Sequence, residues 1–128
     1  EPGTMEFGIG HHGEPGVCVK PLGSAKQMAQ EMVDMVIRDV PFKSGDEVAV
    51  LVSGLGATPV MEQYIFYHEV EELLQQAGIR VYRSYVGNYF TSLEMNGVTL
   101  TMMKLDEELK ECLDMDCACV GLTQARRP

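Results

Sequence analysis

Two adjacent histidines in a glycine-rich stretch have the clearest chemical potential in this chain. His11 and His12 lie between Gly10 and Gly13, and a proline and another glycine follow shortly after. A neutral imidazole can act as a base, an acid, a metal ligand or a nucleophile, and glycines let a backbone approach a small ligand closely. Residue types alone leave a second interpretation open, in which one histidine is solvated and the other hydrogen-bonds within its own loop.

The pattern around these histidines predicts a strand that leads into a loop. Apolar residues alternate over residues 5–9, which predicts a short strand. The Gly and Pro content of residues 10–16 predicts a loop, and residues 17–19 predict a second brief strand. Ligand sites in α/β proteins gather on loops of this kind.

A helix and a central strand are predicted next. Ser24 is followed three residues later by Gln27 in a capping-box pattern, which predicts a helix start. Apolar residues at helical spacing extend this helix to residue 39 or 40, where Pro41 ends it. Residues 48–52 are continuously apolar, a pattern typical of a central strand covered on both faces or nearly so.

A second helix is predicted between this strand and another. Thr58 as N-cap and Pro59 at the first helical position begin it, Gly78 follows its end, and residues 79–86 alternate as a strand. This strand–helix–strand unit should be a right-handed parallel crossover. The positions of this helix expected to face the core are Met61, Tyr64, Ile65, Val70 and Leu73 or Leu74.

The remaining pattern completes a mixed order of elements. Residues 89–96 predict a helical turn or loop, residues 98–105 a strand, Asp106 the cap of a short helix over residues 107–113, and residues 117–122 a last strand. Two strands without a helix between them indicate one antiparallel pair. The predicted fold class is therefore α/β: a single two-layer domain with a mixed sheet and helices mainly on one face.

The turn at residues 54–59 joins a strand to a capped helix, a geometry that can bind phosphate. It lacks the Lys and Ser/Thr pair of the nucleotide-binding loop. We therefore interpret it as a tight turn without a ligand, and we expect no cofactor on this domain.

The third histidine of the chain, His68, is expected at a helix surface or an interface.

Composition disfavours several function classes. The 128 residues fit one compact domain, and 45% of them are apolar, enough for an ordinary core. A formal net charge of −9 disfavours binding to nucleic acid or to a membrane surface. No stretch reaches the roughly 20 apolar residues of a membrane span. No basic N-terminal segment leads into an apolar run, as it would in a signal peptide. We expect a cytoplasmic protein.

The cysteines are expected to be reduced thiols without a metal. They are Cys18, Cys112, Cys117 and Cys119. Cys117 and Cys119 are too close in sequence to pair comfortably with each other, and the spacing supplies no four-ligand set for zinc.

Several ordered segments of the chain resemble the dihydroxyacetone kinase substrate-binding subunit family. They cover most of the chain up to about Leu113, in the order and spacing of the family. They are residues 5–16 (MEFGIGHHGEPG), 44–48 (SGDEV), 52–62 (VSGLGATPVME), 86–97 (VGNYFTSLEMNG) and 99–106 (TLTMMKLD). An unrelated α/β binding module would have to reproduce all of them by coincidence.

The resemblance implies a role for the histidine directly before Gly-Glu-Pro-Gly, which is His12 here. In the family this residue binds the carbonyl carbon of dihydroxyacetone as a hemiaminal, and the kinase phosphorylates the bound ketone (glycerone). An imidazole nitrogen can add to a ketone but not to an alcohol, so such a site would reject glycerol. His11 and Gly13 are expected to contribute to substrate binding.

The resemblance also implies what lies elsewhere. Residues 1–128 resemble the smaller C-terminal domain of the family, whose larger N-terminal domain supplies the acid and base residues. The start at Glu1 without an initiator Met is itself interpreted as a piece of a longer protein, with a processed mature N-terminus as the alternative; the resemblance implies that such a piece is inactive alone. Nucleotide is expected on a separate domain or kinase subunit, the phosphoryl donor being ATP or a phosphotransferase-system subunit. The full-length protein is expected to form a homodimer.

One alternative stays open for the identity of the substrate, and one for the function of the protein. Residues 114–119 (DMDCAC) replace a more usual small and proline-rich tail, which raises the chance of a related ketotriose or ketotetrose substrate. The alternative function is a non-catalytic, dihydroxyacetone-binding regulatory paralogue that signals to a transcription factor. His12 is compatible with both functions, whereas only a kinase needs the acid/base pair.

Overall fold

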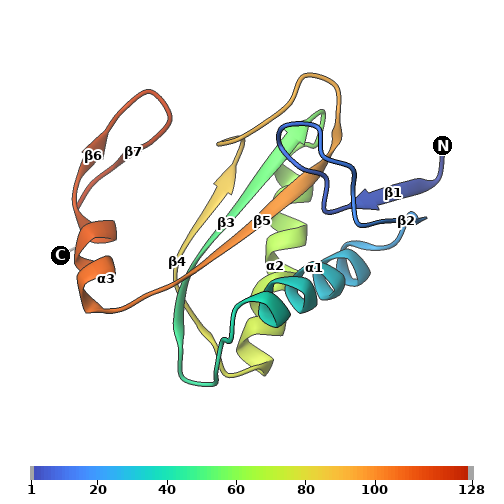
Figure 1. Ribbon diagram of the computed structural model, residues 1–128. Coiled ribbons are helices and arrows are strands. Elements are labelled where there is room, and N and C mark those ends of the chain that lie inside the picture. The colour runs from blue at the N-terminus through green and yellow to red at the C-terminus, as the bar shows by residue number, and fades with distance from the viewer. Residues whose placement is uncertain (1, 127–128) are drawn as a thin grey trace.

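The computed structural model describes residues 2–126, so Glu1 lies outside the described residues. Its helices are α1 (Ala25–Asp39), α2 (Val60–Gln76) and α3 (Glu107–Asp114). Its strands are β1 (Thr4–Phe7), β2 (Cys18–Pro21), β3 (Glu47–Gly56), β4 (Arg80–Gly87), β5 (Asn96–Lys104), β6 (Cys117–Ala118) and β7 (Thr123–Gln124). Figure 1 shows α1 and α2 together beside the long strands, with the β1–β2 and β6–β7 hairpins on opposite sides of the molecule.

β3 is the middle strand of the main sheet, whose order is β4-β3-β5. β4 pairs with β3 in parallel, and β5 pairs with it antiparallel. A central strand, a parallel connection through α2 and an antiparallel pair were all predicted, and all are confirmed. The predicted α/β class with a mixed sheet is confirmed as well.

Alternate side chains of β3 build the core. The core cluster contains Val48, Val50 and Val52 of β3, Ala29 and Val33 of α1, and Phe66, Val70 and Leu74 of α2. Because side chains two positions apart in a strand share a face, both helices cover the same face of the sheet. Ala49 and Ser53, which point to the other face, are also buried. The strand is therefore covered on both faces over much of its length.

The buried face of α2 is only partly the predicted one. Val70 and Leu74 are fully buried, as expected. The prediction is wrong for Met61, Tyr64 and Ile65, which are 72%, 55% and 50% exposed. The helix is rotated relative to the apolar face that the sequence indicates.

Gln63 explains this rotation, because it is a fully buried polar residue near the start of α2. Its Nε2 donates to the Thr58 carbonyl at 3.0 Å and to Asn88 Oδ1 at 2.7 Å, so the donor group of the amide is satisfied in the interior. The predicted N-cap is also wrong. Pro59 is the N-cap of α2, and the Thr58 hydroxyl instead accepts a hydrogen bond from the Gly97 amide at 2.7 Å.

The other helix ends follow the sequence. Ser24 and Gln27 form the complete capping box of α1, and Asp106 Oδ1 accepts from the Leu109 amide at 2.8 Å to cap α3. Gly78, directly after the C-cap of α2, has a φ of +73°, a left-handed conformation that glycine adopts without strain.

Two short hairpins lie outside the main sheet; the sequence predicted strands at residues 5–9, 17–19 and 117–122, but not their pairing into hairpins. β1 pairs antiparallel with β2, and β6 pairs antiparallel with β7. The first strand ends at Phe7, short of residue 9, because Gly8 turns the chain with a φ of +73°. The strand expected over residues 117–122 is interrupted because the Cys119 amide donates to the Leu122 carbonyl at 2.9 Å and closes a turn.

Arg83 of β4 anchors the C-terminal segment. Its side chain is only 7% exposed. Nη2 lies 2.9 Å from Asp114 Oδ1 at the end of α3, and Nη1 donates to Gln124 Oε1 of β7 at 2.7 Å. Gln124 Nε2 donates back to the Leu113 carbonyl at 2.8 Å. One buried guanidinium therefore joins an edge strand to α3 and to the second hairpin.

The rotation of α2 leads to a testable difference between two aliphatic residues. Leu74→Ala should lower the free energy of unfolding by about 2–5 kcal/mol, because it leaves a cavity in the core. Ile65→Ala, on the exposed side of the same helix, should change it by less than about 0.5 kcal/mol. Denaturant unfolding of both variants measures the difference. An equal loss in the two variants would contradict the observed orientation of α2.

Candidate functional site

The histidine loop is the connection between β1 and β2, over residues 8–17. The Val17 amide donates to the Phe7 carbonyl at 2.7 Å, and the Gly16 amide donates to Glu6 Oε1 at 2.8 Å. These bonds close the base of the loop. A Cβ atom at Gly16 would fall 2.7 Å from the Phe7 carbonyl oxygen, so the close return of the chain requires a glycine.

A tight turn at the tip of the loop presents His12 to solvent. The Gly10 amide donates to the Glu14 carbonyl at 3.0 Å, and the Gly13 amide donates to the Gly10 carbonyl at 3.2 Å. Gly13 has a φ of +93°, which would strain a residue with a side chain. The His12 side chain is 89% exposed. The imidazole of His12 is therefore open to solvent in the described residues.

Glu14 folds back onto His12 and orders the turn. Its Oε2 accepts from the His12 amide at 3.1 Å, and its Oε1 lies 3.5 Å from His12 Nδ1. Hydrogen bonds from the backbone amides of Glu14 itself and of His12 hold the pKa of the Glu14 carboxyl below its ordinary value. The carboxylate is therefore ionised at neutral pH beside one nitrogen of the imidazole. The sequence did not identify this partner.

His11 points away from the tip and packs on Phe90. The two rings are stacked with centroids 4.1 Å apart and planes at 21°. Phe90 belongs to the segment between β4 and β5, far from His11 in sequence. His11 therefore connects the histidine loop to the main sheet. A contribution of His11 and Gly13 to substrate binding stays a prediction.

The segment that carries Phe90, residues 88–95, is held against the end of β3. Ser53 is fully buried; its hydroxyl donates to the Phe90 carbonyl at 2.7 Å, and its oxygen accepts from the Phe90 amide at 2.8 Å. The Gly56 amide donates to Thr91 Oγ1 at 3.0 Å. The segment is a loop, one of the two forms that the sequence predicted.

Sequence reasoning did not identify Phe90, Ser53 or Glu14 as site residues. Ser53 carried a signal, because it is a polar residue at the end of an apolar run and a buried hydroxyl needs a partner. Phe90 carried none, since its ring contact joins two distant loops. Glu14 was visible only as part of the motif that contains His12.

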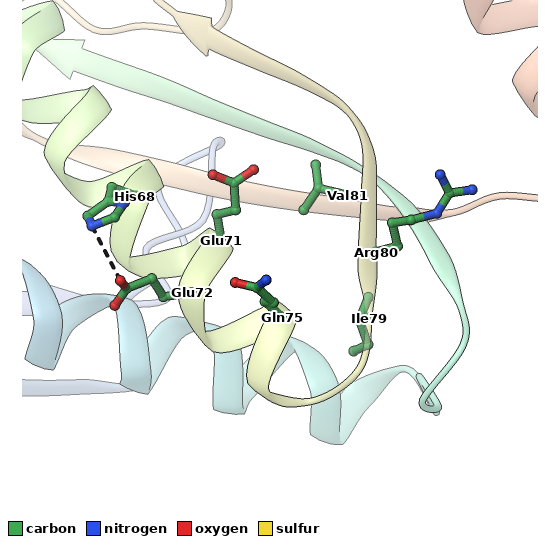
Figure 2. A pocket seen from close by; sticks show the side chains of 7 residues that line it. All are labelled: His68, Glu71, Glu72, Gln75, Ile79, Arg80 and Val81. Atoms are coloured by element: carbon green, nitrogen blue, oxygen red, sulfur yellow. Dashed lines mark ion pairs between the residues drawn. The ribbon is translucent and has the colours of Figure 1, made fainter.

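Two hollows in the described part of the chain lie away from His12. The larger, about 450 Å³, lies between α2 and β4, and Figure 2 shows its lining of His68, Glu71, Glu72, Gln75, Ile79, Arg80 and Val81. His68 Nε2 is 3.5 Å from Glu72 Oε1, and the His68 side chain is 66% exposed, as expected for a helix surface. The smaller, about 340 Å³, is lined by Arg83, Ser84, Tyr85, Tyr89, Leu122, Thr123, Gln124 and Ala125.

Within residues 2–126, no group of three or more His, Cys, Asp or Glu side chains could hold a metal ion. None of the helices described is long and apolar enough to cross a membrane. The expected absence of a metal and of a cofactor stays a prediction.

Comparison with protein families gives one match over most of the chain. Residues 1–121 match the family described as Dak1 domain. The dihydroxyacetone-binding subunit DhaK of the PTS-dependent dihydroxyacetone kinase 2 of Listeria innocua serovar 6a is 42% identical over 90% of this chain. The L-erythrulose 1-kinase of Mycolicibacterium smegmatis is 41% identical over 86% of this chain.

A solved structure agrees with this match. The chain resembles a protein described as the dihydroxyacetone kinase operon co-activator Dha-DhaQ, with a TM-score of 0.84 and 33% identity over 91% of this chain. The chain spans only part of each of these proteins: 35% of the Listeria subunit, 20% of the L-erythrulose 1-kinase and 37% of the co-activator.

The buried hydroxyl of Ser53 can be tested by its removal. Ser53→Ala should lower the free energy of unfolding by about 1–3 kcal/mol, because the Phe90 amide and carbonyl lose their partner. Thr101→Ala, at an exposed position of β5, is the control and should have a smaller effect. Denaturant unfolding gives the stability change, and NMR shifts of the His11 ring report the position of Phe90. An unshifted His11 ring in Ser53→Ala would show that Phe90 does not depend on Ser53.

The contact between Glu14 and the His12 amide should depend on pH. Because the folded-state pKa of Glu14 is lowered, the stabilisation from this contact is fully present above the unfolded-state pKa and is lost as pH falls through the folded-state pKa. An NMR titration should show the His12 amide shift following a Glu14 carboxyl that titrates below the ordinary range of glutamate. Glu14→Gln should abolish this shift, and a shift that persists in Glu14→Gln would contradict the contact.

Proposed function

The chain belongs to the Dak1 domain family, and we propose that it forms the substrate-anchoring part of a kinase for dihydroxyacetone or a related short ketose, with the ketone held on His12 as a hemiaminal. The observation that carries the proposal is the almost fully exposed His12 imidazole with Glu14 beside Nδ1. The names of two relatives, a dihydroxyacetone-binding subunit and an L-erythrulose 1-kinase, support a short ketose as substrate.

Glu14 favours the form of His12 that can act as a nucleophile. A carboxylate near Nδ1 favours the tautomer that carries its proton on Nδ1, which leaves the lone pair on Nε2. That lone pair adds to the carbonyl carbon, a C–N bond forms, and the carbonyl π electrons move to the oxygen. The oxygen then takes up a proton to become a hydroxyl. Glu14 stabilises the positive charge that develops on the ring, or accepts the Nδ1 proton.

Covalent capture gives a basis for selection between ketones and alcohols. Glycerol has no carbonyl carbon, so it cannot form the bond, although its hydroxyl groups are similar to those of dihydroxyacetone. The bond also fixes the terminal hydroxyl of the ketone in one place. Phosphoryl transfer depends mainly on positioning and charge stabilisation, so this fixation lowers the barrier even without further chemistry from His12.

The other parts of the reaction are assigned to groups outside this chain. We place the acid and base residues on an N-terminal domain of the full-length protein, and the nucleotide or other phosphoryl donor on a separate domain or subunit. The donor is ATP or a phosphotransferase-system partner. A cytoplasmic homodimer is the proposed setting for the full-length protein.

The test is the detection of the covalent adduct in the full-length protein. Intact mass or crystallography after addition of dihydroxyacetone should show the hemiaminal in the wild type and not in His12→Ala. Phosphorylation by His12→Ala should fall without necessarily reaching zero, and discrimination against glycerol should weaken more than the rate. His11→Ala should be milder, and His68→Ala, at an exposed helix position, is the matched control. An adduct that survives in His12→Ala, or disappears only in His11→Ala, overturns the assignment.

A regulatory role is the second candidate, because one similar solved structure is described as an operon co-activator. A regulatory paralogue would bind the ketone through His12 without transferring a phosphoryl group. The full-length protein should therefore be assayed with ATP and with a phosphotransferase-system donor. Adduct formation together with phosphorylation supports the kinase. Adduct formation without phosphorylation by either donor supports the regulatory role.

A further inference from the structure

Two thiols occur together at the C-terminal hairpin, on the side of the molecule opposite the β1–β2 hairpin (Figure 1). Cys117 lies in β6, and Cys119 begins the turn that leads to β7. The Cys119 amide donates to the Leu122 carbonyl at 2.9 Å and closes that turn. One residue separates the two cysteines, and Cys117 Sγ lies 3.7 Å from the same Leu122 carbonyl that accepts from the Cys119 amide. Both cysteines therefore contact one carbonyl group at this turn in the reduced protein.

The surroundings of the two thiols are unequal. Cys119 is exposed, and its sulfur accepts hydrogen bonds from the Gly121 and Leu122 amides, which lower the pKa of its thiol. Cys117 is half-buried, its Sγ lies 3.7 Å from the Leu122 carbonyl, and burial raises the pKa of its thiol. Since the thiolate is the reactive form of cysteine, Cys119 would be the attacking thiol and Cys117 the resolving thiol.

We propose that Cys117 and Cys119 form a reversible redox-active dithiol that a low-molecular-weight disulfide, such as glutathione disulfide, oxidises to an intramolecular disulfide. The Cys119 thiolate attacks one sulfur of the oxidant, the S–S bond of the oxidant breaks, and one glutathione leaves as thiolate. The Cys117 thiol then loses its proton and attacks Cys119 Sγ, which releases the second glutathione. The dithiol loses two electrons and two protons, and the oxidant gains them as two thiols.

The turn leaves room for this reaction. Val120 is fully exposed, and a Cβ atom at Gly121 would meet nothing within 4 Å, so the residues between the thiol pair and β7 can adjust. A disulfide between residues two positions apart closes a small ring and is strained. Strained, exposed disulfides are the easily reduced ones. This pair is therefore expected to cycle, with reduced thiols as its resting state.

Cys112 of α3 provides an internal control. It is also exposed, and nothing described for its thiol matches the two amides at Cys119. Trypsin cleavage after Lys110 and Arg126 places all three cysteines in one peptide. A Cys112→Ser background leaves Cys117 and Cys119 as the two thiols of that peptide, so that their products can be read from its mass.

The experiment treats the full-length protein with glutathione disulfide, alkylates the remaining thiols and measures the peptide by mass spectrometry. In the Cys112→Ser background the peptide should lose two hydrogens and resist alkylation, and dithiothreitol should restore both thiols. Adding Cys117→Ser should trap glutathione on Cys119, because the second thiol is missing. Adding Cys119→Ser should abolish the internal disulfide and slow the reaction. In otherwise unaltered protein, Cys112 should react more slowly than Cys119.

Three results overturn the proposal. One is stable glutathione on Cys119 while Cys117 is present, which would leave a single modified thiol. The second is equal reactivity of Cys112 and Cys119, which would remove the role of the turn amides. The third is a disulfide that links Cys112 to either partner in unaltered protein.

Discussion

The two hydrogen bonds between Ser53 and Phe90 connect the core of the molecule to the histidine loop. Ser53 is fully buried at the end of β3, and its hydroxyl satisfies both the amide and the carbonyl of Phe90. The Phe90 ring then stacks on His11, the neighbour of His12. The position of the proposed nucleophile thus depends on a hydroxyl group in the main sheet, through one loop and one ring contact.

Buried polar side chains also hold α2 and the C-terminal segment in place. Gln63 holds the start of α2 against the segment after β4, and Arg83 joins β4 to α3 and β7. A partly buried ion pair such as Arg83–Asp114 adds little net stability, because the loss of hydration offsets the attraction between the charges. Its contribution is geometric, since few arrangements of the C-terminal segment can satisfy a buried guanidinium. Apolar burial stabilises the core, and these polar groups determine how the loops are attached to it.

The elements that the sequence predicted are those set by local chemistry. The capping box at Ser24, the cap at Asp106 and the apolar run of β3 were identified because neighbouring residues encode them. The predicted inward face of α2 was partly wrong because Asn88, one partner of Gln63, comes from a distant segment. The stacking of Phe90 on His11 could not be predicted for the same reason.

The candidate site shows the same difference between features set by neighbouring residues and contacts that form only on folding. His12 was identified from a motif, and its exposure agrees with a loop at the surface. The motif also contains Glu14, but only the folded structure shows that its carboxylate accepts from the His12 amide. The path from Ser53 to His11 joins positions that are close only after folding, so no local pattern reports it.

The β1–β2 hairpin shares no backbone ladder with the main sheet. Side chains attach it to the rest of the molecule: Lys20 forms an ion pair with Glu31 of α1, and His11 stacks on Phe90. A displacement of the whole hairpin would therefore exchange side-chain contacts for water while every hydrogen bond between β3 and its neighbours stays intact. Such a hairpin can open as a local unit at a fraction of the global unfolding free energy. The core can then stay rigid while the histidine loop moves, as the proposed capture and release of a ketone would require.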